Sequence, residues 1–239
     1  MNNTLYRFVT WGFQELIWRG KLTGFQNLPS AGPAVFVANH CAALGPIAVG
    51  GCVPLTLHAW IHGDMLDPLR AADCLRRDFV EPQLHLTPPL SRWLAQGIAK
   101  IHVPLLRSIG AIPVHHTPDK LLETYQQTVD LLAQRECILI FPEDPNQPMD
   151  PHYKMTPFKK GFTRLGELFH ERTHAALAFY PLCVQPQSRT LQVGAPVRYN
   201  AANPAPIERQ RIKSVLEESI HSMFLQALTQ RHMIMPVPN

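Results

Sequence analysis

Short runs of apolar residues alternate along this chain with longer segments in which apolar residues recur at every third or fourth position. The short runs predict strands at residues 33–38, 111–114, 137–141, 175–184 and 190–197, and a possible one at 55–60. The periodic segments predict helices at 44–53, 89–109, 158–170 and 206–232, and a further helix that starts at Pro118. Pro104 should kink or end the helix in which it falls, and residues 61–88 carry no clear pattern.

From this alternation we expect an α/β protein with a central mixed or mainly parallel sheet flanked by helices. Several of the predicted strands are uniformly apolar, as strands covered on both faces are. The 239 residues contain no evident linker and no internal repeat. The expected organisation is an N-terminal segment, residues 1–22, followed by a single domain, residues 23–239.

The N-terminal segment is rich in aromatic residues. Polar side chains between residues 5 and 18 are confined to a narrow stripe at helical spacing. The aromatic residues of this stretch are Tyr6, Phe8, Trp11, Phe13 and Trp18. Because Trp and Tyr favour the boundary between membrane and water, residues 1–22 are predicted to form an amphipathic interfacial helix. A helix packed on the domain core fits the same pattern.

Composition narrows the class of protein. A hydrophobic content of 46% with 17% charged residues excludes a disordered chain. The net charge is +4, but the basic residues are scattered, which argues against a nucleic-acid partner and suits an anionic lipid surface. Five cysteines without a CxxC pair indicate a reducing compartment and no zinc knuckle. Since the sequence has no run of 18 apolar residues, we expect a cytoplasmic, peripherally membrane-associated protein.

Two polar pairs follow directly after predicted buried strands. Asn39 and His40 come after strand 33–38, and Glu143 and Asp144 come after strand 137–141. In open α/β sheets, active groups gather beyond the carboxyl ends of the strands. A neutral imidazole there can act as a general base on a hydroxyl, and a carboxylate can orient it or bind a substrate. A capping Asn, a His bonded to a loop carbonyl and a solvated acid are the structural alternatives.

Other segments give less specific indications of a metal or phosphate site. His58 and His62 are four residues apart, but their segment reads as a strand and no metal site is predicted. Lys159 and Lys160 open the helix predicted at 158–170, whose N-terminus would attract phosphate, although two surface lysines fit equally. The sequence contains no GxGxxG, P-loop or GxSxG motif, so dinucleotide, nucleoside triphosphate and serine-hydrolase chemistry lose their main support.

Five segments resemble, in order and spacing, the motifs of the glycerolipid acyltransferase superfamily, which includes the lysophosphatidic acid acyltransferases. They are GFQNLPSAGPAVFVANH, LLRSIGAIPVHH, LIFPEDPNQ, FKKGFTRLGEL and AFYPLCV, within residues 24–199. The resemblance implies a glycerolipid-acyltransferase-like fold and acyl transfer from acyl-CoA or acyl carrier protein to an alcohol, with no cofactor besides this co-substrate. It implies His40 as the general base and Glu143 as the second catalytic residue. The substrate-binding residues expected from it are Asn39, Cys41, His116, Asp144, Lys159 and Lys160.

The chain departs from the family pattern at three places. Gly45 stands where the family has the Asp that orients its His, and His116 stands where the second motif has Arg. Residues 144–146, Asp-Pro-Asn, replace the Gly-Thr-Arg of the third motif. Two missing arginines remove bidentate phosphate contacts, which points away from lysophosphatidate and toward an atypical acceptor, such as one without a phosphomonoester. The alternative is that Lys159, Lys160 and His116 hold a phosphate in another way. Asp144 and Asp64 are the candidates for orienting His40 instead, and Gly45→Asp is expected to raise the rate.

The leading hypothesis is a peripheral-membrane acyltransferase of phospholipid metabolism or lipid biosynthesis, which moves a fatty acyl group from a thioester to a hydroxyl of a lipid-like acceptor. The first alternative is a catalytically degenerate protein of the same fold that binds lipid or acyl groups. The second is a metal-dependent hydrolase built on the histidines. Retention of His40 and Glu143 favours the enzyme, whereas Gly45 in place of Asp favours the binding protein.

Overall fold

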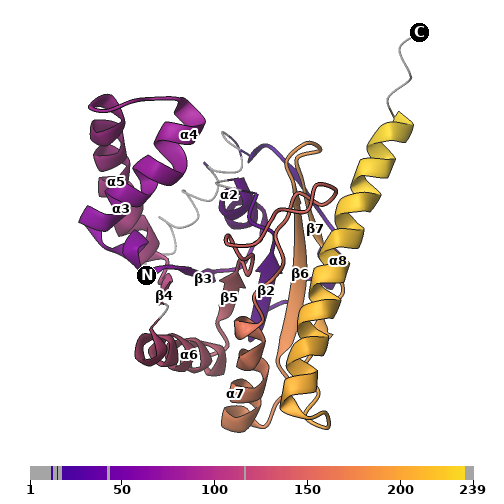
Figure 1. Cartoon of the computed structure of the whole chain (residues 1–239). Coiled ribbons are helices and arrows are strands. Elements are labelled where there is room, and N and C mark those ends of the chain that lie inside the picture. The colour runs from indigo at the N-terminus through magenta and orange to yellow at the C-terminus, as the bar shows by residue number, and fades with distance from the viewer. Residues whose placement is uncertain (1–11, 13–14, 16–17, 42–43, 116, 235–239) are drawn as a thin grey trace. The chain divides into compact units, whose positions relative to one another are not determined.

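The computed structural model describes residues 12, 15, 18–41, 44–115 and 117–234 of the chain. The chain divides into two compact units (Figure 1). Among the described residues, the smaller unit consists of residues 58–128, and the larger one of those up to 57 and from 129 onward. Helix α6 (Pro118–Ala133) begins in the smaller unit and ends in the larger one.

The larger unit is built on a mixed sheet with the strand order β1-β7-β6-β2-β5. β2 (Ala34–Ala38) runs parallel to both of its neighbours, β5 (Cys137–Ile140) and β6 (Ala178–Gln185). β7 (Thr190–Val193) and the short β8 (Val197–Arg198) pair with β6 in the antiparallel direction. β1 (Lys21–Thr23) lies parallel to β7 at the edge. The parallel centre of this sheet places the carboxyl ends of β2 and β5 side by side.

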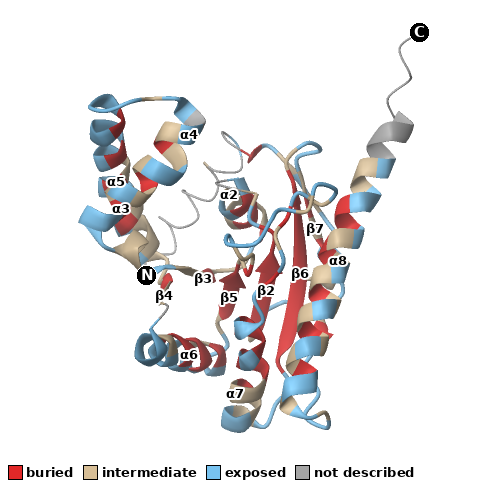
Figure 2. Cartoon of the chain, viewed as in Figure 1, coloured by how far each residue is buried: buried red, intermediate tan, exposed pale blue. Residues whose placement is uncertain are grey.

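The three central strands form the core of the larger unit. Every residue of β2, β5 and β6 is buried, and these strands stand out as the continuous buried part of Figure 2. Helices α2 (Leu44–Cys52), α7 (Arg164–Thr173) and α8 (Ala205–Ile234) belong to the same unit, and α8 packs along β6. The buried positions of α8 recur at every fourth residue, at Ile212, Leu216, Ile220 and Phe224.

The smaller unit contains the parallel pair β3 (Leu57–His62) and β4 (Ile112–Val114) and a group of helices. Residues 63–84 form the 3-10 turn η3 (Gly63–Leu66), helix α3 (Pro68–Leu75), the π turn η4 (Arg76–Val80) and α4 (Glu81–Leu84). The long helix α5 (Leu90–Ser108) packs on α3 through a core of small residues. Asp67 starts α3 by accepting hydrogen bonds from the backbone N–H groups of Leu69 and Arg70.

The α/β class with a mixed, mainly parallel central sheet flanked by helices is confirmed. Two predicted helices differ in detail. α5 continues through Pro104 to Ser108, because Pro104 is exposed and the backbone carbonyl that loses its partner there can bond water. The helix expected at residue 158 starts with the 3-10 turn η5 (Gly161–Thr163), and α7 follows from Arg164.

The N-terminal helix predicted for residues 1–22 lies largely outside the described residues. Trp18 is described, and only 2% of its surface is exposed. Trp18 is therefore a core residue of the larger unit, and the interfacial helix stays a prediction for the rest of the segment. No helix within the described part of the chain is long and apolar enough to cross a bilayer.

Candidate active site

The candidate residues follow two paired strands. β2 and β5 are parallel, and Val37 lies opposite Ile140 at their carboxyl ends. Asn39 and His40 continue from β2, and the segment Phe141–Glu143 continues from β5. The two polar pairs therefore meet at one edge of the sheet, as their positions in the sequence predict.

The Glu143 carboxylate joins the two loops. Its Oε1 accepts a hydrogen bond of 2.6 Å from the backbone N–H of His40. Its Oε2 accepts one of 2.9 Å from the backbone N–H of Thr156, with the Thr156 hydroxyl at 3.5 Å. Each carboxylate oxygen thus holds a backbone donor from a different segment, so Glu143 fixes the course of the chain at His40.

The His40 side chain is exposed at this edge. Its ring packs edge-on against the ring of Phe141, with 5.1 Å between the centroids and 70° between the planes. Such contacts between ring edge and ring face are favourable and restrict the orientation of the imidazole. An accessible, oriented imidazole at the carboxyl ends of two parallel strands can take a proton from a bound hydroxyl.

The Asn39 side chain is buried and bonds to the backbone of β6. It has 0% of its surface exposed. The Asn39 amide nitrogen donates to the carbonyl of Val184 at 3.0 Å, and its oxygen accepts from the Val184 backbone N–H at 2.7 Å. The amide therefore continues the β2–β6 ladder by one step, and the substrate contact expected of Asn39 stays a prediction.

Cys41 forms the turn after His40. It has a positive φ of 46°, which is uncommon for a residue other than glycine. Burial, with a smaller effect of the Glu143 carboxylate, raises the pKa of the Cys41 thiol to about 12. The thiol is therefore protonated near neutral pH and is a poor nucleophile. Its contacts with Asn39 and the Val184 carbonyl are those of a turn residue.

Asp144 and Lys159 form an ion pair, with 3.3 Å between Oδ1 and Nζ. Hydrogen bonds, first from the backbone N–H of Asn146 and then from Lys159, lower the pKa of Asp144. Lys160 is exposed, and its carbonyl accepts the Thr163 hydroxyl at the start of η5. Both lysines precede the helix, and the charge of Lys159 is largely offset by Asp144.

The described histidines of the smaller unit are not gathered around a common point. His58 and His62 lie on strand β3, four residues apart and therefore roughly 13 Å apart along the strand. The His58 ring contacts the Gly110 carbonyl at 3.0 Å, and His62 lies 3.7 Å from Asp64. No group of three His, Cys, Asp or Glu residues suited to a metal ion occurs among the described residues. His116 lies outside them.

Gly45, which replaces the motif Asp, is buried on α2 directly behind His40. A Cβ added at this position would overlap the His40 carbonyl oxygen and would lie 3.0 Å from that of Asn39. Backbone atoms cannot yield as a flexible side chain can, so this backbone excludes an Asp at position 45. The expectation that Gly45→Asp would orient His40 does not fit the structure.

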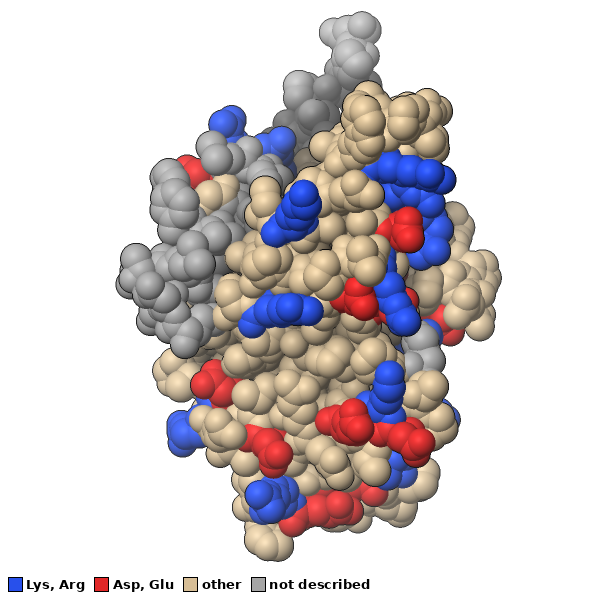
Figure 3. All heavy atoms as spheres, turned by 90° about the vertical axis from the view of Figure 1, so that its left-hand side faces the viewer, with Lys and Arg blue, Asp and Glu red and all other residues tan. Residues whose placement is uncertain are grey.

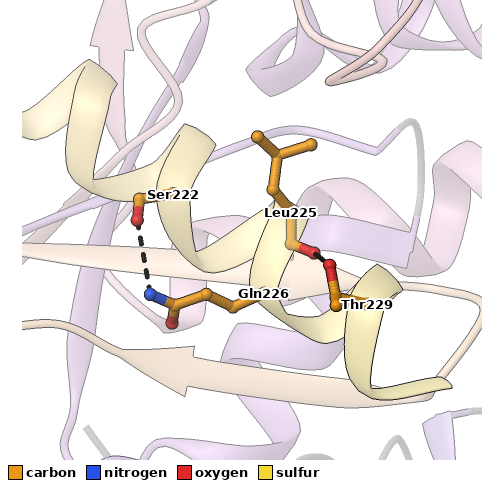
Figure 4. A pocket seen from close by; sticks show the side chains of 4 residues that line it. All are labelled: Ser222, Leu225, Gln226 and Thr229. Carbon is orange, nitrogen blue, oxygen red and sulfur yellow. Dashed lines mark hydrogen bonds between the residues drawn. The ribbon is translucent and has the colours of Figure 1, made fainter. Parts of the chain in front are cut away.

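A depression of about 360 Å³ lies elsewhere, on α8, and is lined by Ser222, Leu225, Gln226 and Thr229 (Figure 4). Its polar groups are engaged locally: Gln226 donates to the Ser222 hydroxyl, and the Thr229 hydroxyl donates to the Leu225 carbonyl. All four residues belong to one helix. The depression therefore lacks the converging groups from several elements that a catalytic site requires.

The comparisons with known proteins bear on the fold. The chain is similar to the 1-acyl-sn-glycerophosphate (LPA) acyltransferase PlsC from Thermotoga maritima, with a TM-score of 0.50 and 14% sequence identity. The match covers 90% of this chain and 78% of that chain. The chain thus has an acyltransferase-like α/β fold. No protein-family model and no curated protein matches it.

Proposed function

We propose that this protein is a peripheral-membrane acyltransferase that moves a fatty acyl group from a thioester, acyl-CoA or acyl carrier protein, to a hydroxyl of a lipid-like acceptor. The observation that carries the proposal is the hydrogen bond between Glu143 and the backbone of His40 at the carboxyl ends of β2 and β5. The PlsC-like fold and the order of the five sequence motifs support it.

In the proposed reaction His40 is the general base. Its neutral imidazole takes the proton of the acceptor hydroxyl as the oxygen attacks the thioester carbonyl. The C–O bond forms, the tetrahedral intermediate collapses, and the C–S bond breaks. The imidazolium returns its proton to the leaving thiolate, so the products are the acyl ester and the free thiol.

Glu143 is assigned a positioning role. Both of its carboxylate oxygens hold backbone N–H groups, one of them from His40 itself. Because the Glu143 carboxylate is charged, these two hydrogen bonds are strong and hold the loop that contains His40. Glu143→Gln would keep the shape of the side chain but place an amide donor against one of these N–H donors.

The acceptor is proposed to lack a phosphomonoester. Asp144 stands in the third motif, where the family has an uncharged Gly, and Lys159 is already paired with the Asp144 carboxylate. A carboxylate at this position repels a dianionic headgroup. An alcohol with a neutral headgroup suits the charges better.

The alternative is a catalytically degenerate protein of the same fold that binds lipid or acyl groups. The observation in its favour is Gly45, whose surroundings exclude the side chain of an orienting Asp. An orienting carboxylate is worth about 10⁴ in rate in a Ser-His-Asp system. Without an orienting Asp at position 45, acyl transfer with His40 as the base would be slow or absent.

The test is thiol release and ester formation with a panel of acyl thioesters and lipid alcohols. His40→Ala should lower the rate roughly 100-fold or more, as the loss of a general base does. His152→Ala, which removes an exposed histidine of the same unit, is the matched control and should retain the wild-type rate. If the wild-type protein transfers nothing yet binds acyl thioester, the binding-protein alternative replaces the enzyme.

A further inference from the structure

Helix α5 of the smaller unit carries an exposed apolar face. Its large side chains Leu90, Trp93, Leu94 and Ile101 are exposed by 54%, 70%, 37% and 74%. Their spacing of three, four and seven residues places them on one side of the helix. Gly97 and Pro104, which are also exposed, lie on the same side and add no polar group.

The opposite face of α5 is buried and consists of small residues. Ser91, Ala95, Ala99 and Val103 recur at every fourth position and face the core formed with α3. Small residues let two helices approach closely. Trp93 and the other exposed apolar side chains of α5 therefore point away from this core, which is unusual for a surface helix. A clustered apolar surface of this kind indicates a binding partner.

The charged residues of α5 itself have one sign. The sequence contains no acidic residue between Glu81 and Asp119, whereas α5 contributes the exposed Arg92, Lys100 and Arg107. The arginines nearer to α3 are paired with carboxylates, as in Arg76 with Glu81 at 2.8 Å. Figure 3 looks onto this side of the smaller unit, where some Lys and Arg side chains stand alone in the uncharged surface and others lie beside Asp or Glu.

We propose that this α5 face docks the protein on an anionic lipid bilayer. Trp beside aliphatic residues, with flanking Lys and Arg, is the composition of a helix that lies in a membrane interface. Anionic headgroups attract each such basic residue. A second copy of this chain is a poorer partner, because it would bring the same basic residues together. The proposal is independent of catalysis: a chain that binds vesicles without transferring acyl groups leaves it intact.

The test is co-sedimentation of the full chain with phosphatidylcholine vesicles that contain or lack phosphatidylglycerol. Trp93→Ser/Ile101→Ser should weaken binding at least roughly tenfold, since two exposed apolar side chains no longer enter the interface. Phe25→Ser/Ile207→Ser removes two residues of similar exposure, 70% and 61%, from the larger unit and should leave binding unchanged. Equal pelleting of the α5 variant and the wild type, or equal losses in both variants, overturns the proposal.

The contribution of a basic residue and the depth of Trp93 in the bilayer provide two further tests. Lys100→Gln should lower binding to the anionic vesicles about fivefold, whereas Lys120→Gln, which alters an exposed lysine on α6, should not. Brominated lipids should quench Trp93, so Trp93→Phe should retain binding but lose part of the quenching. Unchanged quenching in Trp93→Phe overturns the proposal. So does an α5 variant that alters self-association in the absence of vesicles while its vesicle binding is unchanged.

Discussion

At position 45 the backbone has no room for a side chain. A Cβ there would overlap the His40 carbonyl oxygen. Gly45→Ala is therefore expected to lower the free energy of unfolding by about 1–3 kcal/mol, the usual cost of overpacking. Gly45→Asp should cost at least as much and should lower the activity, because the strain falls on the residue that carries the base. Urea unfolding and the acyl-transfer assay measure the two effects.

Gly50 provides the matched control on the same helix. A Cβ at Gly50 would meet no atom within 4 Å. Gly50→Ala should leave activity unchanged and stabilise the helix by up to about 1 kcal/mol, since Ala has the higher helix propensity. If Gly45→Asp folds with wild-type stability and gains activity, the close approach of α2 to His40 is not as described.

Adjacent residues at this site have opposite environments. Asn39 is fully buried and bonded to Val184, whereas His40 is exposed beside Phe141. The sequence predicts the pair, because both follow an apolar strand. It does not predict which of the two faces the solvent, since that depends on where β2 stops pairing with β6.

At the scale of elements, the segment between β5 and η5 is held from two sides. Glu143 pairs with Phe158 in an isolated bridge, and Thr156 donates to the Glu143 carboxylate. From the other side, Glu217 on α8 accepts a hydrogen bond of 2.7 Å from the backbone N–H of Phe158 and pairs with Lys213. The long closing helix therefore supports the loop that holds His40.

Glu217→Ala should remove this support. The free energy of unfolding should fall by about 1–3 kcal/mol, because the Phe158 N–H loses a charged acceptor and Lys213 loses its partner. The acyl-transfer rate should fall with it. Thermal unfolding and the transfer assay provide the measurements.

The neighbouring Glu218 is exposed and offers the control on the same helix turn. Glu218→Ala should change neither stability nor rate. Glu217→Gln should recover part of the loss, since its amide oxygen can still accept from Phe158. Equal effects of Glu217→Ala and Glu218→Ala would show that α8 does not support the loop.

The elements with long or uniform patterns are predictable from the sequence, and the short ones are not. The buried strands β2, β5 and β6 and the helices α5, α6 and α8 follow from apolar periodicity. Residues 63–84 were missed because helices of eight and four residues around a π turn give too few turns for a period. The cap at Asp67 with Pro68 at the first helical position is the one local signal there.

The supporting contacts of the site are beyond the reach of sequence patterns. Thr156 and Glu143 are 13 residues apart, and Phe158 and Glu217 are 59 residues apart. Such pairs depend on how the loops return to the sheet. The sequence shows which polar residues follow the strands, but it does not show which backbone groups their side chains bind.

At the scale of the whole molecule, the lowered pKa values of several carboxylates favour the folded state at neutral pH. Hydrogen bonds lower the pKa values of Glu208 and of four aspartates or glutamates at the surface, namely Asp64, Glu81, Asp144 and Asp150. Each such carboxylate stabilises the fold above its unfolded-state pKa and loses that effect as the pH falls toward its folded-state pKa. Burial lowers the pKa values of His102 and His221, so protonation below about pH 6.5 also favours unfolding.

Glu208 should contribute most to this acid sensitivity. Its side chain is fully buried at the start of α8 and bonds to Arg211, Asn203 and the Asn200 N–H. The Arg211 hydrogen bond is the main cause that lowers the pKa of Glu208 from 4.5 to about 2. This shift corresponds to about 3 kcal/mol of stability, present above pH 4.5 and lost as the pH falls toward 2.

Glu208→Gln is therefore expected to lower the free energy of unfolding by about 3 kcal/mol at pH 7, with a gap to the wild type that closes as the pH approaches 2. Urea unfolding at pH 7, 5 and 3 measures the gap. Glu171→Gln, which neutralises an exposed glutamate on α7, should show no gap at any of these pH values. A gap for Glu208→Gln that stays constant from pH 7 to pH 3 would mean that packing at this position, and not the charge held by Arg211, stabilises the junction between β8 and α8.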